Sequence, residues 1–186
     1  MEEQDRRAYE SYRTTGEFSR LGRGYRRHCG PTAITNLLLT LRRQGETQLQ
    51  DPAAVFRSVA SLGTHRLCYG NFDLLGHWGG TSDLLSPLYL RSCLRRFGFP
   101  RLKIGPRRRL NAKRLEAAVN SGAVLYLQLR RHPRYGNHHL LCYGAQRDGE
   151  TGEWRLRVAD GWTAAPVELP LRELRRCWCI PIEKKT

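Results

Sequence analysis

The sequence contains no apolar run approaching the roughly 18 residues that a membrane-spanning helix requires, so no transmembrane segment is predicted. Residues 1–24 are polar and lack the apolar core of a signal peptide, which predicts no secretory signal. No internal repeat, low-complexity tract or clear linker divides the 186 residues, and this length fits one domain with a sizeable core. We therefore expect a single-domain cytoplasmic protein without a membrane partner.

Metal-binding and disulfide motifs are also absent. Six cysteines occur, but no two have the Cys-x-x-Cys spacing, and no histidine spacing completes a zinc set. His65 and His77 flank a glycine-rich segment without supplying a ligand pattern. Reduced thiols in a cytosolic protein are therefore expected, with no metal and no cofactor.

Lysine is scarce although the chain is strongly basic. Only four of the 32 basic residues are lysines, and the net charge is +15. The arginines are scattered along the chain, and neither an aromatic-interleaved stripe nor an RNA-binding signature accompanies them. This pattern favours a solvated basic surface over a nucleic-acid site. The positive field still favours acidic partners at low salt.

Helical and strand patterns occupy different halves of the chain. Apolar spacing and capping residues predict helices at 31–43, 52–62, 83–97 and 112–120, the third limited by Pro87. Alternation predicts strands at 123–130, 138–146, 153–159 and 177–182, and residues 63–82 read as a long loop. This order predicts an α+β domain with helices packed on one side of an antiparallel sheet. A polar extension (1–24) would precede a mainly helical half (25–122) and a mainly β half (123–186).

Residues 27–38, RHCGPTAITNLL, place a cysteine directly before a predicted helix. The free N–H groups and the dipole of that helix favour a thiolate, so we expect them to lower the pKa of Cys29. Gly30 allows a tight turn and leaves the thiol unobstructed, and the backbone N–H of Cys29 is suited to an oxyanion. Taken alone, the segment fits a buried structural cysteine equally well.

A nucleophilic cysteine also needs a base, and the base needs an orienting group. His138 and His139 open a predicted strand, and one of them should face inward. Asp160 ends the next predicted strand, where a carboxylate would fix the imidazole tautomer. These residues, in the order Cys, His, Asp, predict a catalytic triad.

Three segments carry a resemblance to a known family. Residues 29–33 (CGPTA), followed by Asn-Leu-Leu at 36–38, resemble the nucleophile segment of papain-like cysteine peptidases. The resemblance is strongest to the bacterial branch that includes the bacteriocin-leader-processing peptidases. Residues 138–144 (HHLLCYG) are similar to the base segment of that branch, and residues 158–162 (VADGW) are similar to its third segment.

The resemblance implies a papain-like fold and a peptidase that works through an acyl-enzyme on a peptide or protein substrate. Carried over position by position, it makes Cys29 the nucleophile, His138 the general base and acid, and Asp160 the orienting carboxylate. Gly144, six residues after His138, selects that histidine over His139. Trp162 would cover the His–Asp pair and exclude water.

One position departs from the family pattern. The family usually places a Gln about six residues before the cysteine as an oxyanion donor, and Arg23 stands there. Arg23 could donate instead, or backbone N–H groups could form the oxyanion hole. Two alternatives to hydrolysis follow: acyl transfer on the same triad, and a catalytically silent binding module whose basic surface holds an acidic partner.

Two neighbours of the cysteine allow further expectations. His28 is either an exposed polar residue or an added positive charge near the thiolate. Asn36 lies on the predicted nucleophile helix, where we expect a buried hydrogen bond to a neighbouring loop.

Overall fold

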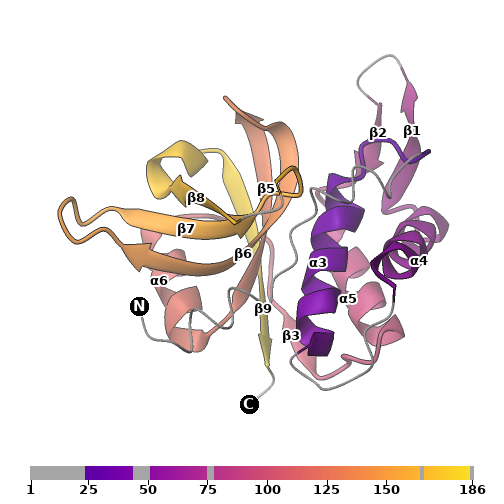
Figure 1. Ribbon diagram of the computed structural model, residues 1–186, viewed down its shortest axis with the longest axis horizontal. Coiled ribbons are helices and arrows are strands. Elements are labelled where there is room, and N and C mark those ends of the chain that lie inside the picture. Colours follow the sequence, from indigo (N-terminus) through magenta and orange to yellow (C-terminus); the bar gives the residue numbers. More distant parts are fainter. Residues whose placement is uncertain (1–23, 44–50, 75–77, 164–165, 185–186) are drawn as a thin grey trace.

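The computed structural model describes residues 24–43, 51–74, 78–163 and 166–184. Helices α3 (Cys29–Arg43), α4 (Pro52–His65) and α5 (Ser86–Arg96) lie beside a large antiparallel sheet (Figure 1). The predicted α+β class is confirmed. Among the described helices, none combines the length and the apolar character needed to cross a membrane.

The large sheet has seven strands in the order β3-β9-β5-β6-β7-β8, with β4 pairing with β9. Every pairing is antiparallel. The strands are β3 (Leu102–Ile104), β4 (Arg108–Arg109), β5 (Val124–His132), β6 (Gly136–Arg147), β7 (Trp154–Ala159), β8 (Val167–Pro170) and β9 (Cys177–Lys184). Helix α6 (Ala112–Ser121) precedes β5, and a 3₁₀ turn (Leu171–Leu174) follows β8.

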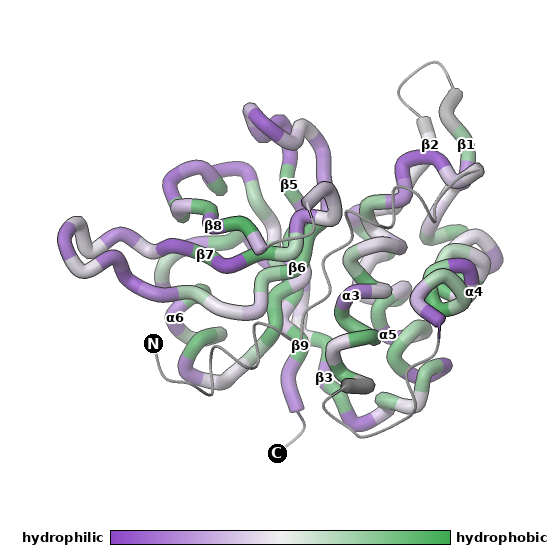
Figure 2. Tube along the Cα trace, viewed as in Figure 1, coloured by the Kyte–Doolittle hydropathy of each residue, from purple (hydrophilic) through white to green (hydrophobic). Residues whose placement is uncertain are grey.

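The central strands of this sheet are buried on both faces, and successive side chains of a strand point to opposite faces. Tyr126 of β5 belongs to the core beneath α3, α4 and α5, whereas Leu125 and Leu127 belong to a second core that includes Leu115 of α6. Apolar residues accordingly run along β5 and β6 (Figure 2). The expectation that all helices pack on one side is wrong for α6, because the second apolar face also requires cover.

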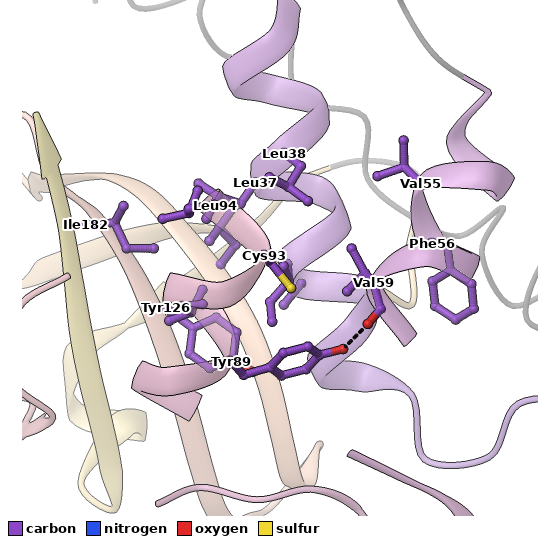
Figure 3. Close-up of a cluster of buried hydrophobic side chains, with 14 of the residues drawn as sticks. Leu37, Leu38, Val55, Phe56, Val59, Tyr89, Cys93, Leu94, Tyr126 and Ile182 are labelled. Atoms are coloured by element: carbon purple, nitrogen blue, oxygen red, sulfur yellow. Dashed lines mark hydrogen bonds between the residues drawn. The ribbon is translucent and has the colours of Figure 1, made fainter. Parts of the chain in front are cut away.

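The core of the helical half fixes the helix that begins at Cys29. Figure 3 shows Leu37 and Leu38 of α3 packed among side chains of α4 and α5. The hydroxyl of Tyr89 on α5 donates to the carbonyl of Val59 on α4 at 2.7 Å, which satisfies a buried phenol. This packing holds the start of α3 against the sheet.

The predicted loop at 63–82 is wrong, because β1 (Tyr69–Leu74) and β2 (Trp78–Thr81) form a separate two-stranded antiparallel sheet there. Its glycines hide the alternation that reveals a strand. Gly70 pairs with Gly80, and Gly79 has a φ of +119° that favours glycine. The short strands β3, β4 and β8 were not predicted either.

Candidate active site

Cys29 is the first residue of α3 and lines a pocket of about 1020 Å³. The pocket takes its walls from both halves: residues before and in α3, the segment from β2 to Leu84, the β5–β6 hairpin, and Gly161 and Trp162 after β7. Cys29 is half-buried, whereas the other five cysteines are buried, and no disulfide forms within the described residues. Cys29 is thus the one cysteine among the residues that line the pocket.

The loop before Cys29 is fastened to β1. The Asn71 side chain accepts from the N–H of Arg26 at 2.7 Å and donates to the carbonyl of Gly24 at 3.2 Å. The hydroxyl of Tyr69 donates to the carbonyl of Arg26 at 2.6 Å. The β1–β2 sheet therefore positions the chain that leads into the cysteine.

Gly30 is required for close packing rather than for a turn. It is the second residue of α3, and its φ is not among the positive values. A Cβ at this position would overlap the side chain of Thr81, coming within 2.6 Å of the Thr81 Cβ. The absence of a side chain lets β2 approach the start of the helix.

Gly30→Ala is therefore expected to lower the free energy of unfolding by about 1–3 kcal/mol, because Thr81 or the helix must shift. For a chain of this size the melting temperature should fall by roughly 3–10 °C in a calorimetric scan. Gly149→Ala is the matched control, since nothing lies within 4 Å of its Cβ position and its φ is not positive. Equal melting temperatures for the two variants would refute the close-packing role.

His138 opens the buried part of β6 with one ring nitrogen fixed. Its Nε2 lies 2.6 Å from the carbonyl oxygen of Asp160. A carbonyl only accepts, so Nε2 carries the hydrogen, and Nδ1 of the neutral ring keeps its lone pair. The ring stacks on Tyr135 with 5.4 Å between centroids and contacts Trp162 at 5.0 Å. This environment holds the imidazole in the tautomer that a base at Nδ1 needs.

Asp160 lies beside His138, but its carboxylate does not contact the ring. One carboxylate oxygen accepts from the backbone N–H groups of Trp162 and Thr163 at 2.9 Å each. The other accepts from the hydroxyl of Tyr135 at 3.0 Å. The predicted carboxylate–imidazole contact is thus replaced by a carbonyl–imidazole contact. The Asp160 side chain instead stabilises the turn that orients its own carbonyl.

Trp162 covers one side of His138 and remains open to solvent. Its ring centroid also lies 5.0 Å from that of Tyr135, and 53% of the residue is exposed. The rings of Tyr135, His138 and Trp162 thus form a mutually contacting cluster, and Trp162 also lines the pocket. Trp162 thus shields the ring only in part.

His139 cannot take the same role, since both of its ring nitrogens have partners. Nε2 lies 2.9 Å from a carboxylate oxygen of Asp83, and Nδ1 lies 2.6 Å from the hydroxyl of Tyr126. Its backbone instead contributes to the cysteine, because the main chain of His139 hydrogen-bonds Cys29. Of these two histidines, His138 is the one that keeps a ring nitrogen without a hydrogen-bond partner among the described residues.

Asp83, between β2 and α5, connects the two halves at the pocket and was missed as a site residue. Besides His139, its carboxylate accepts from Arg130 at 2.8 Å and lies 3.9 Å from Arg107. Its backbone carbonyl accepts from the side chain of Gln128 at 2.9 Å. In the sequence it resembles an ordinary residue at a helix start, so no local signal distinguishes it.

The electrostatics favour a neutral thiol and a neutral imidazole. Burial raises the pKa of the Cys29 thiol above its ordinary value, although backbone hydrogen bonds from His139, Gly30 and Cys29 itself oppose the shift. Burial also lowers the pKa of His138, a shift that its hydrogen bond to the Asp160 backbone opposes. The expectation of a lowered cysteine pKa is therefore wrong, because desolvation outweighs the helix terminus.

The remaining predicted residues divide into three groups. Arg23 and His77 lie outside the described residues. His28 is half-buried, with its Nδ1 2.9 Å from the Thr32 hydroxyl, and burial lowers its pKa, which argues against an added charge. Asn36 is buried, but its side chain has no hydrogen-bond partner in the described part of the chain, so the expected bond to a loop is absent.

Comparison of the sequence with models of protein families finds no match, and comparison with curated proteins finds none at the significance required. The chemistry of this pocket must therefore be argued from its own residues.

Proposed function

We propose that this chain is a cysteine peptidase of papain-like fold that hydrolyses peptide bonds through an acyl-enzyme. The observation that carries the proposal is a pocket lined both by a cysteine at a helix start and by a histidine whose Nδ1 has no hydrogen-bond partner among the described residues. The helical half supplies the first group and the sheet supplies the second. A substrate bound between the halves would contact both.

In the proposed mechanism His138 removes the proton of Cys29 as the sulfur attacks the substrate carbonyl. General-base assistance is needed because the raised thiol pKa leaves little thiolate at neutral pH. The C–N bond of the tetrahedral intermediate then breaks, and His138 returns the proton to the leaving amine. A water molecule, deprotonated by the same imidazole, then attacks the thioester. The C–S bond breaks, the acid is released, and the imidazolium returns its proton to the sulfur of Cys29.

The negative charge on the tetrahedral oxygen needs donors that are already in place. The backbone N–H of Cys29 at the start of α3 is suited to this role, and a second donor would come from the substrate-facing walls. Thr81 and Ser82, whose side chains carry hydroxyl groups, line the pocket. These groups support the proposal without the Gln that the family usually carries.

The proposal is tested by incubating the purified chain with unfolded proteins and identifying new termini by mass spectrometry. We expect cleavage that disappears in Cys29→Ala and persists in Cys93→Ala, whose thiol is buried in the core of the helical half. Hydroxylamine added to the reaction would trap an acyl-enzyme as a hydroxamate. Identical product patterns for the wild type and Cys29→Ala would contradict the proposal.

A further inference from the structure

Two arginines that line the Cys29 pocket have an unusual backbone conformation. Three non-glycine residues have positive φ in the described part of the chain, and two of them are Arg27 (φ 48°) and Arg131 (φ 51°). Arg27 comes from the loop before α3, Arg131 comes from β5, and both line the pocket. Such conformations cost about 1–3 kcal/mol and occur preferentially at binding sites.

A bulge in the β5–β6 hairpin directs Arg131. The register of the pair shifts between Leu129 and His132, which leaves the residues between them out of the regular ladder. The backbone N–H of Arg131 donates to the Asn137 side chain at 3.0 Å, and this bond holds the strained conformation. Bulges re-aim side chains at the ends of sheets. Here the bulge places a guanidinium on the wall of the pocket.

The charges that line the pocket are not balanced. Three arginines contribute to its walls, Arg27, Arg130 and Arg131, and the carboxylate of Asp83 is the acidic group among the lining residues. Asp83 is already occupied by His139 and Arg130. Arg131 is exposed, and none of the described carboxylates lies within ion-pair distance of it. Among the described residues, Arg131 therefore brings a positive charge without an ion-pair partner to the pocket that Cys29 also lines.

We propose that this pocket selects peptides that carry an acidic side chain beside the reacting carbonyl, with Arg131 as the main specificity residue. The inference rests on the proposed function, since it describes the substrate of the same thiol. A guanidinium presents paired donors that match a carboxylate, which gives geometric selectivity in addition to attraction. The excess of 32 basic over 17 acidic residues would draw such peptides toward the protein.

The test uses tetrapeptidyl acyloxymethyl ketones, which alkylate a nucleophilic thiol, with Glu or Gln placed in turn at each of the three positions nearest the ketone. Iodoacetamide serves as the reagent that reports thiol reactivity alone. For at least one position, Cys29 should react roughly threefold or more faster with the Glu reagent. This preference should shrink when NaCl rises from about 0.05 to about 0.5 M.

Arg131→Gln should bring the Glu-to-Gln rate ratio close to one, and Arg131→Lys should retain most of it. Arg95→Gln, an exposed arginine on α5, is the matched control and should keep the wild-type ratio. Equal rates for the Glu and Gln reagents at every position, with iodoacetamide still labelling Cys29, would overturn the specificity and leave the proposed function intact. Failure of every reagent to label Cys29 would contradict the proposed function and, with it, this inference.

Discussion

His138→Ala is expected to reduce kcat/KM for peptide cleavage roughly 10³-fold, because the variant loses both the base for Cys29 and the acid for the leaving amine. The loss should be large because the thiol does not ionise readily by itself. Burial raises its pKa above the ordinary value of 9.0, so general-base assistance carries most of the attack at neutral pH. Activity is measured on a fluorogenic peptide derived from a mapped cleavage site.

The pH dependence distinguishes loss of the base from misfolding. Burial lowers the pKa of His138 below 6.5, so the wild-type kcat/KM should fall only on an acidic limb below that value and stay level near neutrality. Without the imidazole, residual activity requires thiolate and should keep rising above pH 9. His65→Ala, an exposed histidine on α4, should retain the wild-type profile. A level profile for His138→Ala near neutrality would exclude His138 as the base.

The helices and central strands could be predicted because their signals are local. Pro52 follows Asp51, whose side chain accepts from the N–H of Ala53 at 3.0 Å, and the helix starts where the sequence indicates. Asn111 caps α6 in the same way, and Gly122 ends that helix with a φ of +64°. A strand as short as β4 has too few residues to show an alternating apolar pattern. Its extended conformation depends on its pairing with β9.

The candidate site could be predicted only at the level of residue type and chain order. Cys29 and His138 could be selected because each lies in a short segment of sequence that resembles a known nucleophile or base segment. Sequence could not reveal that Asp160 orients the histidine through its carbonyl, because that depends on the turn its carboxylate closes. Asp83 was missed for a similar reason, since its partners lie at least 24 residues away in the sequence and meet only in the fold.

The network around Asp83 connects the two halves of the protein at the pocket. Its carboxylate comes from the helical half, whereas Arg107, Arg130 and His139 come from the sheet side. Burial opposes ionisation, but hydrogen bonds and charge from His139 and Arg130 outweigh it and lower the pKa of Asp83 below 3.8. The ionised carboxylate thus ties the segment before α5 to the sheet at His139 and Arg130.

Asp83→Asn should therefore lower the free energy of unfolding at pH 7 by about 2–3 kcal/mol. The negative charge is lost, and one of the two carboxylate oxygens becomes an NH2 group that cannot accept from its partner in a largely buried site. The melting temperature should fall by roughly 5–10 °C. A lowered carboxyl pKa contributes stability that is complete above the unfolded-state value of 3.8 and is lost as the pH falls through the folded-state value. The difference between wild type and variant should accordingly be constant from pH 7 to pH 5 and shrink below pH 3.8.

The control for this prediction is Glu116→Gln, which removes an exposed ion pair with Arg147 whose side chains are 51% and 57% exposed. Exposed pairs contribute about 0–1 kcal/mol, so this variant should melt within a few degrees of the wild type at every pH. An Asp83→Asn difference as small as that of the control would mean that the halves are held together by the apolar core alone. A difference that persisted unchanged below pH 3 would mean that the loss arises from altered packing rather than from the carboxylate charge.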